Sequence, residues 1–258
     1  MAPLPPDVLN PYESEKLLAE YLLFHYGSEE EIFGRIPAPR DARDFPVRCV
    51  HELIDADALL QPARALDLGC SVGRSSFELG RFCAEVLGID RSQSFIEAAS
   101  VLQERGVLPV DVVTEGDIGE GLRARVPAGL DRRRVRFQTG DAMKLPEDLG
   151  GFDLVLAANL ICRLPEPRVF LRRLPDLVNP GGQLLLTTPF TWLEEYTPRS
   201  QWLGGRKEEG IRSAEALKEI LDPDFELQLT RDLPFVIREH ERKFQYGIAL
   251  GWRWIRRR

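Results

Sequence analysis

Side chains that bind metals and segments that cross membranes are scarce in this sequence. Its 258 residues include four cysteines and three histidines, with no C-x-x-C pair and no histidine at zinc-binding spacing from a cysteine. No apolar run reaches transmembrane length, and the N-terminal MAPLPPDVLNPYESEK lacks the apolar stretch of a secretory signal. We therefore expect no metal site, no membrane contact, reduced thiols and a soluble, cytoplasmic protein.

An excess of positive charge is lacking as well. The net charge of −7 and the isoelectric point of about 5.2 disfavour an extended polyanion, so we expect no nucleic-acid partner. The arginine runs at residues 132–134 and 256–258 have no interleaved aromatic platform, which is typical of a solvated surface. The length is sufficient for one large α/β domain with a sizeable core.

The order of the apolar runs predicts the fold class. Short strands separated by helical segments are expected at residues 63–68, 84–89, 135–138, 152–157 and 183–188. Such alternation is typical of a parallel sheet with helices on both faces. Residues 225–231 and 246–254 are joined by too little chain for a helical crossover, so we expect them to form an antiparallel pair at the sheet edge.

The segments outside this alternation are predicted less fully. Residues 1–62 are expected to form an N-terminal helical cap that contributes to the substrate site, above a core of residues 63–258 in one structural domain. The cap would hold one helix over residues 14–26, ended by Gly27, then an irregular link and a second helix over residues 45–60. Residues 107–134 lengthen a connection within the core, and we assign them no function.

The loop Gly69-Cys70-Ser71-Val72-Gly73 after the first core strand has two interpretations. It fits G-x-S-x-G, the turn that presents the nucleophilic serine of an α/β-hydrolase. That turn comes after several strands and needs a downstream histidine, and the one available, His240, lies in a charged run. The spacing also differs from the G-x-G-x-x-G of dehydrogenases. A loop that binds a cofactor is therefore favoured, and we expect the backbone at Ser71 to avoid positive φ.

Polar residues follow the next three strands. Asp90 lies about 20 residues past the loop, where an acid binds ribose hydroxyls in nucleotide-binding folds. Asp141 and Met143 follow the third strand, and Asn159 follows the fourth. Each residue alone is explained as well by a helix cap or a turn. Together with the glycine loop they indicate a nucleotide cofactor along one edge of the sheet.

These stretches resemble those of class I S-adenosylmethionine (SAM)-dependent methyltransferases. The resemblance rests on ALDLGCSVGRSS, LGIDRS, TGDAMKLP, FDLVLAANLICRL and NPGGQLLLTT, which span most of residues 64–188. It implies a Rossmann-like, seven-stranded, mostly parallel sheet and SAM as cofactor, with S-adenosylhomocysteine as product. It also implies a cofactor site made of Asp67, Gly69, Cys70, Ser71, Gly73, Arg74, Asp90, Arg91, Asp141, Ala142, Met143 and Asn159.

The flanking segments resemble a narrower family. YLLFHYGSEEE, FPVRCV, TPFTWLEEYTPRSQWLGG and LPFVIREHERKFQY are similar to the mercaptohistidine N-methyltransferase found as the C-terminal domain of ovothiol synthases. The resemblance implies methylation of the side-chain-proximal (π) imidazole nitrogen of 5-thiohistidine, giving ovothiol A. The chain would be a stand-alone version, supplied by a separate sulfoxide synthase. Two alternatives stay open: another small imidazole, thiol or carboxylate as acceptor, or a SAM-binding module without catalysis.

An amino-acid acceptor requires a cation for its carboxylate and a flat slot for its ring. For the carboxylate we nominate Arg48 first and Arg163 second, because a guanidinium fork matches it bidentately; a solvated helix arginine is the other interpretation of Arg48. For the slot we nominate Tyr26, Phe45, Trp192 and Tyr196, the last two on an aromatic loop at residues 190–204 that suits a lid. Packing on the N-terminal helices would also explain such aromatics. Asn159 or Tyr26 would orient the ring.

Overall fold

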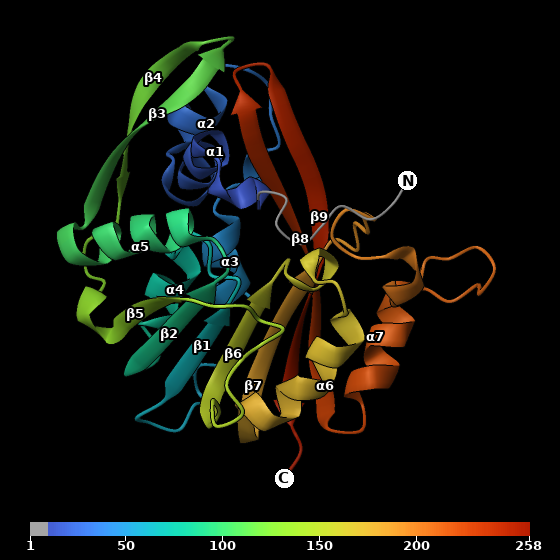
Figure 1. Cartoon of the computed structure of the whole chain (residues 1–258). Helices are drawn as coiled ribbons and strands as arrows, with labels where there is room; N and C mark the ends of the chain where they lie inside the picture. The colour runs from blue at the N-terminus through green and yellow to red at the C-terminus, as the bar shows by residue number, and fades with distance from the viewer. Residues whose placement is uncertain (1–9) are drawn as a thin grey trace.

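A computed structural model of the chain describes residues 10–258 (Figure 1), and the start of the predicted cap, residues 1–9, lies outside them. A seven-stranded sheet with the strand order β5-β2-β1-β6-β7-β9-β8 forms the centre. Its strands are β1 (Arg64–Leu68), β2 (Glu85–Asp90), β5 (Val135–Thr139), β6 (Phe152–Ala158), β7 (Val178–Thr188), β8 (Phe225–His240) and β9 (Lys243–Arg256). The first five are parallel to one another, and β9 runs antiparallel to both β7 and β8. The predicted fold class, with its antiparallel C-terminal pair, is confirmed.

Side chains of the central strands alternate between two buried clusters, as the two-residue period of a strand requires. On β6, Leu156 belongs to the same cluster as Phe77 of α4, whereas Val155 belongs to the same cluster as Phe170 of α6. Helices α3, α4 and α5 therefore cover one face of the sheet, and α6 and α7 cover the other (Figure 1). Strands buried on both faces explain why their sequences read as continuous apolar runs.

The helices confirm some predicted boundaries and correct others. They are α1 (Glu15–Tyr26), α2 (Glu29–Phe33), α3 (Phe45–His51), α4 (Arg74–Leu79), α5 (Gln93–Arg105), α6 (Pro167–Leu177) and α7 (Ser213–Leu221). The first predicted helix is confirmed, with the Ser14 side chain accepting from the Leu17 N–H, and Gly27 ends it with an ordinary negative φ. The link expected to be irregular holds α2, which a capping box begins at Ser28. The second predicted helix ends at His51, earlier than expected, and α7 was not predicted.

Residues 107–134, which had no predicted structure, contain a separate antiparallel hairpin, β3 (Val107–Glu115) and β4 (Ile118–Arg125). Its inner face carries the buried side chains of Val112, Leu122 and Ala124, and its outer face is charged. The hairpin rises beside α1 and α2, which lie between it and the β8–β9 hairpin, above the carboxyl ends of the parallel strands (Figure 1). Two hairpins from distant parts of the sequence therefore hold the N-terminal helices over the sheet edge.

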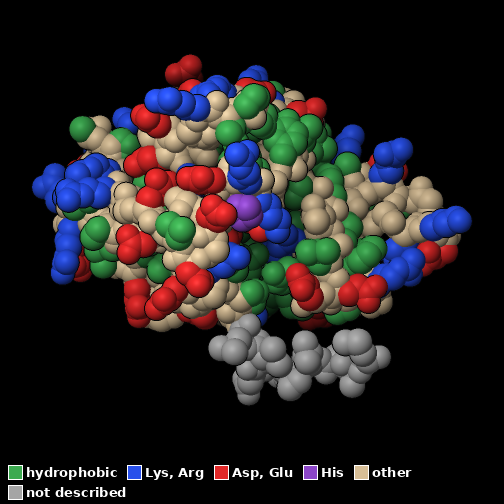
Figure 2. All heavy atoms as spheres, turned by 90° about the horizontal axis from the view of Figure 1, so that it is seen from above, with side chains coloured by type: hydrophobic (Ala, Val, Ile, Leu, Met, Phe, Trp, Pro, Cys, Tyr) green, Lys and Arg blue, Asp and Glu red, His purple; other side chains and the backbone are tan. Residues whose placement is uncertain are grey.

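Between residues 10 and 258, no helix combines the length and apolarity that a membrane span requires. All four cysteines are buried and free. The same part of the chain contains no group of three or more His, Cys, Asp and Glu side chains able to hold a metal ion. Seen from above, Lys, Arg, Asp and Glu side chains are interspersed over the face that carries the N-terminal helices (Figure 2).

Candidate active site at the carboxyl ends of the strands

The loop after β1 has a backbone that needs small residues. Gly69, Ser71 and Gly73 all have positive φ, of 73°, 51° and 86°. A Cβ on Gly73 would lie 2.5 Å from the Cζ atom of Phe137, so that position requires glycine. The expectation that Ser71 avoids positive φ is wrong. A serine in this left-handed conformation costs about 1 kcal/mol, and strain of this kind is characteristic of ligand-binding loops.

The Asp90 carboxylate, at the end of β2, holds this loop in place. It accepts hydrogen bonds of 2.9 Å from the Ser71 N–H and from the Ser92 N–H. Burial raises the pKa of Asp90, and the backbone N–H donors of Ser92 and Ser71 partly oppose this effect. Each carboxylate oxygen keeps a lone pair with which it can accept from a ribose hydroxyl. The hydroxyl of Ser71 is buried and has no hydrogen-bond partner among residues 10–258, so it is available to a ligand.

Asp67, near the end of β1, lies beneath the loop. Its side chain is almost fully buried and accepts from the Ser76 hydroxyl at 2.6 Å. The pKa of Asp67 is raised to about 7, mainly by burial; the hydrogen bond from Ser76 opposes this shift and the Asp90 charge adds to it. A buried carboxylate in this state gains from a nearby cation, such as the ammonium of a methionine moiety.

The remaining predicted cofactor residues differ in how they are placed. Asp141 is half-buried and accepts from the Met143 N–H at 2.9 Å, so part of its role is to form its own turn. Ala142 and Met143 pack against the core on the α6 side. The Arg91 side chain is exposed to solvent. Arg74, at the start of α4, forms an ion pair with Glu78.

Asn159 follows β6 in a left-handed conformation, with a φ of 52°. Its N–H donates to the Thr187 carbonyl at 2.9 Å, and its Oδ1 accepts from the Thr187 hydroxyl at 3.0 Å. Because Thr187 is fixed on β7, its hydroxyl holds the Asn159 side-chain amide in one orientation, with Oδ1 toward Thr187. Its NH₂ group has no hydrogen-bond partner among the residues that the structure describes, and it remains as a donor for a ligand.

Arg163 and Tyr196 meet near Asn159, together with tyrosines that the sequence analysis missed. The Arg163 guanidinium carbon lies 4.8 Å from the ring centroid of Tyr196. The ring of Tyr12 lies 6.3 Å from that of Tyr196 and 5.9 Å from that of Tyr21. Tyr21 lies within the first predicted helix, for which no residue other than Tyr26 was given a site role. Tyr12 precedes that helix and lies in the 3₁₀ segment η1 (Pro11–Glu13), so no periodicity identified it.

Three predicted substrate residues contact other parts of the protein. Arg48 donates to Glu52 at 2.6 Å and to the carbonyls of Asp41 and Pro234 at 2.8 and 2.9 Å, so it links α3 to β8. Phe45 is buried in the core, where its ring lies between those of Phe24 and Phe235, 6.0 and 5.2 Å away. Trp192 donates from its indole nitrogen to the Ser213 hydroxyl at 2.9 Å, at the start of α7.

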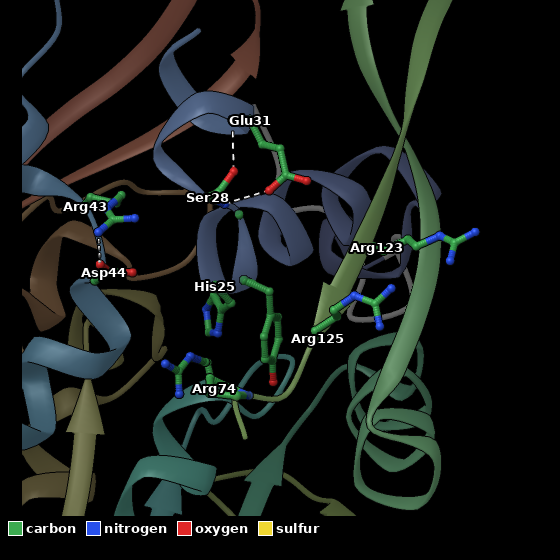
Figure 3. A pocket seen from close by; sticks show the side chains of 11 residues that line it. His25, Ser28, Glu31, Arg43, Asp44, Arg74, Arg123 and Arg125 are labelled. Atoms are coloured by element: carbon green, nitrogen blue, oxygen red, sulfur yellow. Dashed lines mark hydrogen bonds and ion pairs between the residues drawn. The ribbon is translucent and has the colours of Figure 1, made fainter. Parts of the chain in front are cut away.

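Tyr26 contacts the loop after β1 and also lines a cavity. Its hydroxyl donates to the Val72 carbonyl at 2.8 Å, so its proton is already engaged. Behind it lies a cavity of about 470 Å³, lined by His25, Tyr26, Gly27, Ser28, Glu31, Arg43, Asp44, Arg74, Arg123, Arg125 and Pro127 (Figure 3). Burial, and secondarily the Arg74 charge, lower the pKa of His25 to about 3, so that its imidazole is neutral. Asn159, Arg163 and Tyr196 do not line this cavity, and the Arg123 and Arg125 side chains point away from His25 (Figure 3).

Comparisons with known sequences agree on the central part of the chain. Residues 66–186 match the family described as methyltransferase domain. The chain is 30% identical over 149 residues to a ubiquinone biosynthesis O-methyltransferase of Azorhizobium caulinodans, covering 57% of this chain and 48% of that protein. It is 27% identical over 180 residues to a probable chloroplastic tocopherol O-methyltransferase of Oryza sativa subsp. japonica, covering 67% and 42%. The chain therefore spans about half the length of the curated relatives that it matches.

Solved structures share the fold over nearly the whole chain. The [4+2]-cyclase SpnF matches with a TM-score of 0.58 at 20% identity, covering 95% of this chain and 94% of that one. Magnesium protoporphyrin IX methyltransferase from Synechocystis PCC 6803, with bound SAM, matches with a TM-score of 0.53 at 18% identity, covering 96% and 100%. Because a cyclase has the same fold, the fold alone does not decide the reaction. Residues 66–186 are thus similar in sequence to a methyltransferase domain, and the likeness to these structures, at 20% identity or less, shows that the chain shares their fold.

Proposed function

We propose that this protein methylates the π imidazole nitrogen of 5-thiohistidine with SAM and so produces ovothiol A. The observation that carries the proposal is the grouping of a half-buried guanidinium, that of Arg163 four residues along the chain from Asn159, with the rings of Tyr12, Tyr21 and Tyr196. A cation between aromatic rings suits a small, flat acceptor that carries a carboxylate. The flanking segments, which resemble mercaptohistidine N-methyltransferases, support the same acceptor.

The residues at the strand ends fit SAM. Gly69 and Gly73 let the loop pack closely on the protein, since a Cβ on either would meet Leu160 or Phe137, and the loop between them offers backbone and the Ser71 hydroxyl to a ligand. Asp90 would accept hydrogen bonds from the ribose hydroxyls. Asp67 would balance the positive charge of the SAM ammonium, and the unpartnered Ser71 hydroxyl would contact the methionine moiety. When bound, SAM supplies an electrophilic methyl group on a sulfonium.

The chain's own contribution would be to position the acceptor. The Asn159 NH₂ group would donate to the thiolate of the acceptor and so fix the ring plane, because its Oδ1 is held by Thr187. The attacking nitrogen must first release its proton to solvent. It then forms a bond to the methyl carbon while the carbon–sulfur bond of the sulfonium breaks, and that electron pair stays on sulfur. The thiolate keeps the ring electron-rich, so a strong protein base is unnecessary.

A second candidate is O-methylation of a phenol. It is favoured by the likeness to relatives that include O-methyltransferases of ubiquinone biosynthesis. A phenolic acceptor would use the same strand ends and the same tyrosine rings, but it would leave Asn159 without a thiolate to bind. A panel of acceptors distinguishes the two candidates directly.

The test is mass spectrometry of the purified protein incubated with SAM and 5-thiohistidine, with histidine and a catechol as controls. A gain of one methyl group on 5-thiohistidine alone, placed on the π nitrogen by NMR, is the expected result. No gain on 5-thiohistidine, with SAM binding shown by calorimetry, would refute the acceptor and leave the cofactor site in place. SAM binding with no methylation of any acceptor would favour a module without catalysis.

A further inference from the structure

We infer that Arg163, with the hydroxyls of Tyr12 and Tyr196, binds the carboxylate of the acceptor, and that the N-terminal segment of residues 10–14 completes this site. The inference rests on the proposed function and names the part of the acceptor that the site recognises. It also gives a role to Tyr12, which belongs to none of the motifs of the cofactor site.

The first support is an unpaired positive charge. The Arg163 side chain is half-buried, and its Nη1 donates to the carbonyls of Cys162 and Thr191, both at 3.1 Å. None of the Asp and Glu side chains between residues 10 and 258 forms an ion pair with it, in contrast to Arg48, which pairs with Glu52. A partly buried charge without a counter-ion is unfavourable, so an anionic ligand would be stabilised there.

The second support is the geometry of the free donors. With Nη1 occupied, Nε and Nη2 form the open edge of the guanidinium, which matches the two oxygens of a carboxylate. The ring of Tyr196, 4.8 Å from the guanidinium carbon, restricts the plane of that fork. Burial raises the pKa of Tyr196, and burial raises that of Tyr21 well above 10, so these phenols stay protonated at neutral pH. They therefore do not compete with a carboxylate for the cation.

The third support is the way in which Tyr12 is held. The next residue, Glu13, accepts from the Gln93 N–H at 2.9 Å and from the Ser94 N–H at 3.1 Å, in the first turn of α5. The Ser92 hydroxyl donates to the Tyr12 carbonyl at 2.9 Å, while the Ser92 N–H donates to Asp90. Tyr12 is thus fixed to the same corner that would bind the ribose. Residues 10–14 therefore connect the proposed carboxylate site to the Asp90 corner of the cofactor site.

The experiment compares two acceptors, 5-thiohistidine and its decarboxylated analogue 5-thiohistamine, in the full-length protein with saturating SAM. The variants are Arg163→Gln and Tyr12→Phe, and the matched control is Arg172→Gln, an exposed arginine on α6. In Arg163→Gln the KM for 5-thiohistidine should rise about 10- to 100-fold, because this variant loses a hydrogen bond between charged groups. The kcat should change less. The KM for 5-thiohistamine should change less than about twofold. Tyr12→Phe should raise the KM for 5-thiohistidine by about 3- to 10-fold.

Failure of this inference is separable from failure of the proposed function. A wild-type protein that methylates both acceptors with equal KM, or an Arg163→Gln variant that raises both KM values equally, would overturn the carboxylate site while methyl transfer stands. If the wild type methylates neither acceptor, binding of sodium benzoate, a simple carboxylate, is measured instead by saturation-transfer NMR. Benzoate binding that is lost in Arg163→Gln and kept in Arg172→Gln would retain the site. Equal binding in both variants, or none in the wild type, would overturn it.

Discussion

The Asn159 amide offers the sharpest test of how the acceptor is positioned. Asn159→Ala removes the amide but also places alanine at a φ of 52°, a conformation that costs an alanine about 1–2 kcal/mol. Asn159→Gly removes the same amide and tolerates this backbone. The two variants therefore separate the loss of a hydrogen-bonding group from the strain of the backbone.

The expected magnitudes follow from the contacts. A hydrogen bond from the Asn159 NH₂ group to a thiolate contributes about 1.5–3 kcal/mol, which corresponds to a roughly 10- to 100-fold loss of kcat in both variants. SAM affinity should change less than about threefold, because Asp90 and the glycine loop would hold the cofactor. Asn159→Ala should be less stable than Asn159→Gly by about 1 kcal/mol. In a chain of this size that difference lowers the melting temperature by about 2–4 °C.

The assay combines single-turnover methylation of 5-thiohistidine, SAM calorimetry and thermal unfolding, with Thr187→Val as the companion variant. Valine keeps the shape of the buried Thr187 and removes the hydroxyl that fixes Oδ1, so its kcat should lie between those of the wild type and Asn159→Gly. A wild-type rate in Asn159→Gly would remove the amide from the mechanism. A rate lost in Asn159→Ala but restored in Asn159→Gly would show that backbone conformation, not the amide, is what the reaction needs.

Three further predictions concern the cofactor loop. Gly73→Ala should destabilise the fold by about 2 kcal/mol more than Gly129→Ala. Both glycines have a φ near 85°, but only a Cβ at position 73 would meet Phe137. Urea unfolding of both variants measures the difference in free energy of unfolding. Tyr26→Phe leaves the Val72 carbonyl without its donor, so SAM should bind about 3- to 10-fold more weakly by calorimetry, and an unchanged Kd would contradict a role for Tyr26 in holding the loop. Burial raises the pKa of Asp67 from 3.8 to about 7, so the folded state binds more protons than the unfolded state in this range, and the free energy of unfolding should fall as pH rises from 3.8 to about 7. Asp67→Asn should flatten that dependence in pH-resolved unfolding, and an equal slope in both proteins would refute the assignment.

Local patterns in the sequence were sufficient for much of the fold and for the cofactor edge. The apolar runs predicted β1, β2, β6 and β7 because strands covered by helices on both faces are apolar on both faces. The edge strand β5, most of which is exposed, was predicted from a shorter apolar run. Asp90, Asp141 and Asn159 were predicted to share one edge because parallel strands all end there, and β2, β5 and β6 do belong to one sheet; Asp67 was nominated only from the family resemblance. The β3–β4 hairpin was missed because valines on both faces of β3 and two glycines in β4 leave a weak alternation of apolar and polar residues.

The partners of individual side chains depended on the tertiary structure. Arg48 was ranked above Arg163 as a carboxylate ligand, yet Arg48 donates to Pro234, 186 residues away, and the Arg163 guanidinium lies over the ring of Tyr196. Phe45 and Tyr196 were both aromatic candidates for the slot, and only Tyr196 is near Arg163. Hydrogen bonds and ring contacts of this kind form between elements that fold together from remote parts of the chain. Local periodicity reports which face of an element is buried, and it carries no information on what that face will meet.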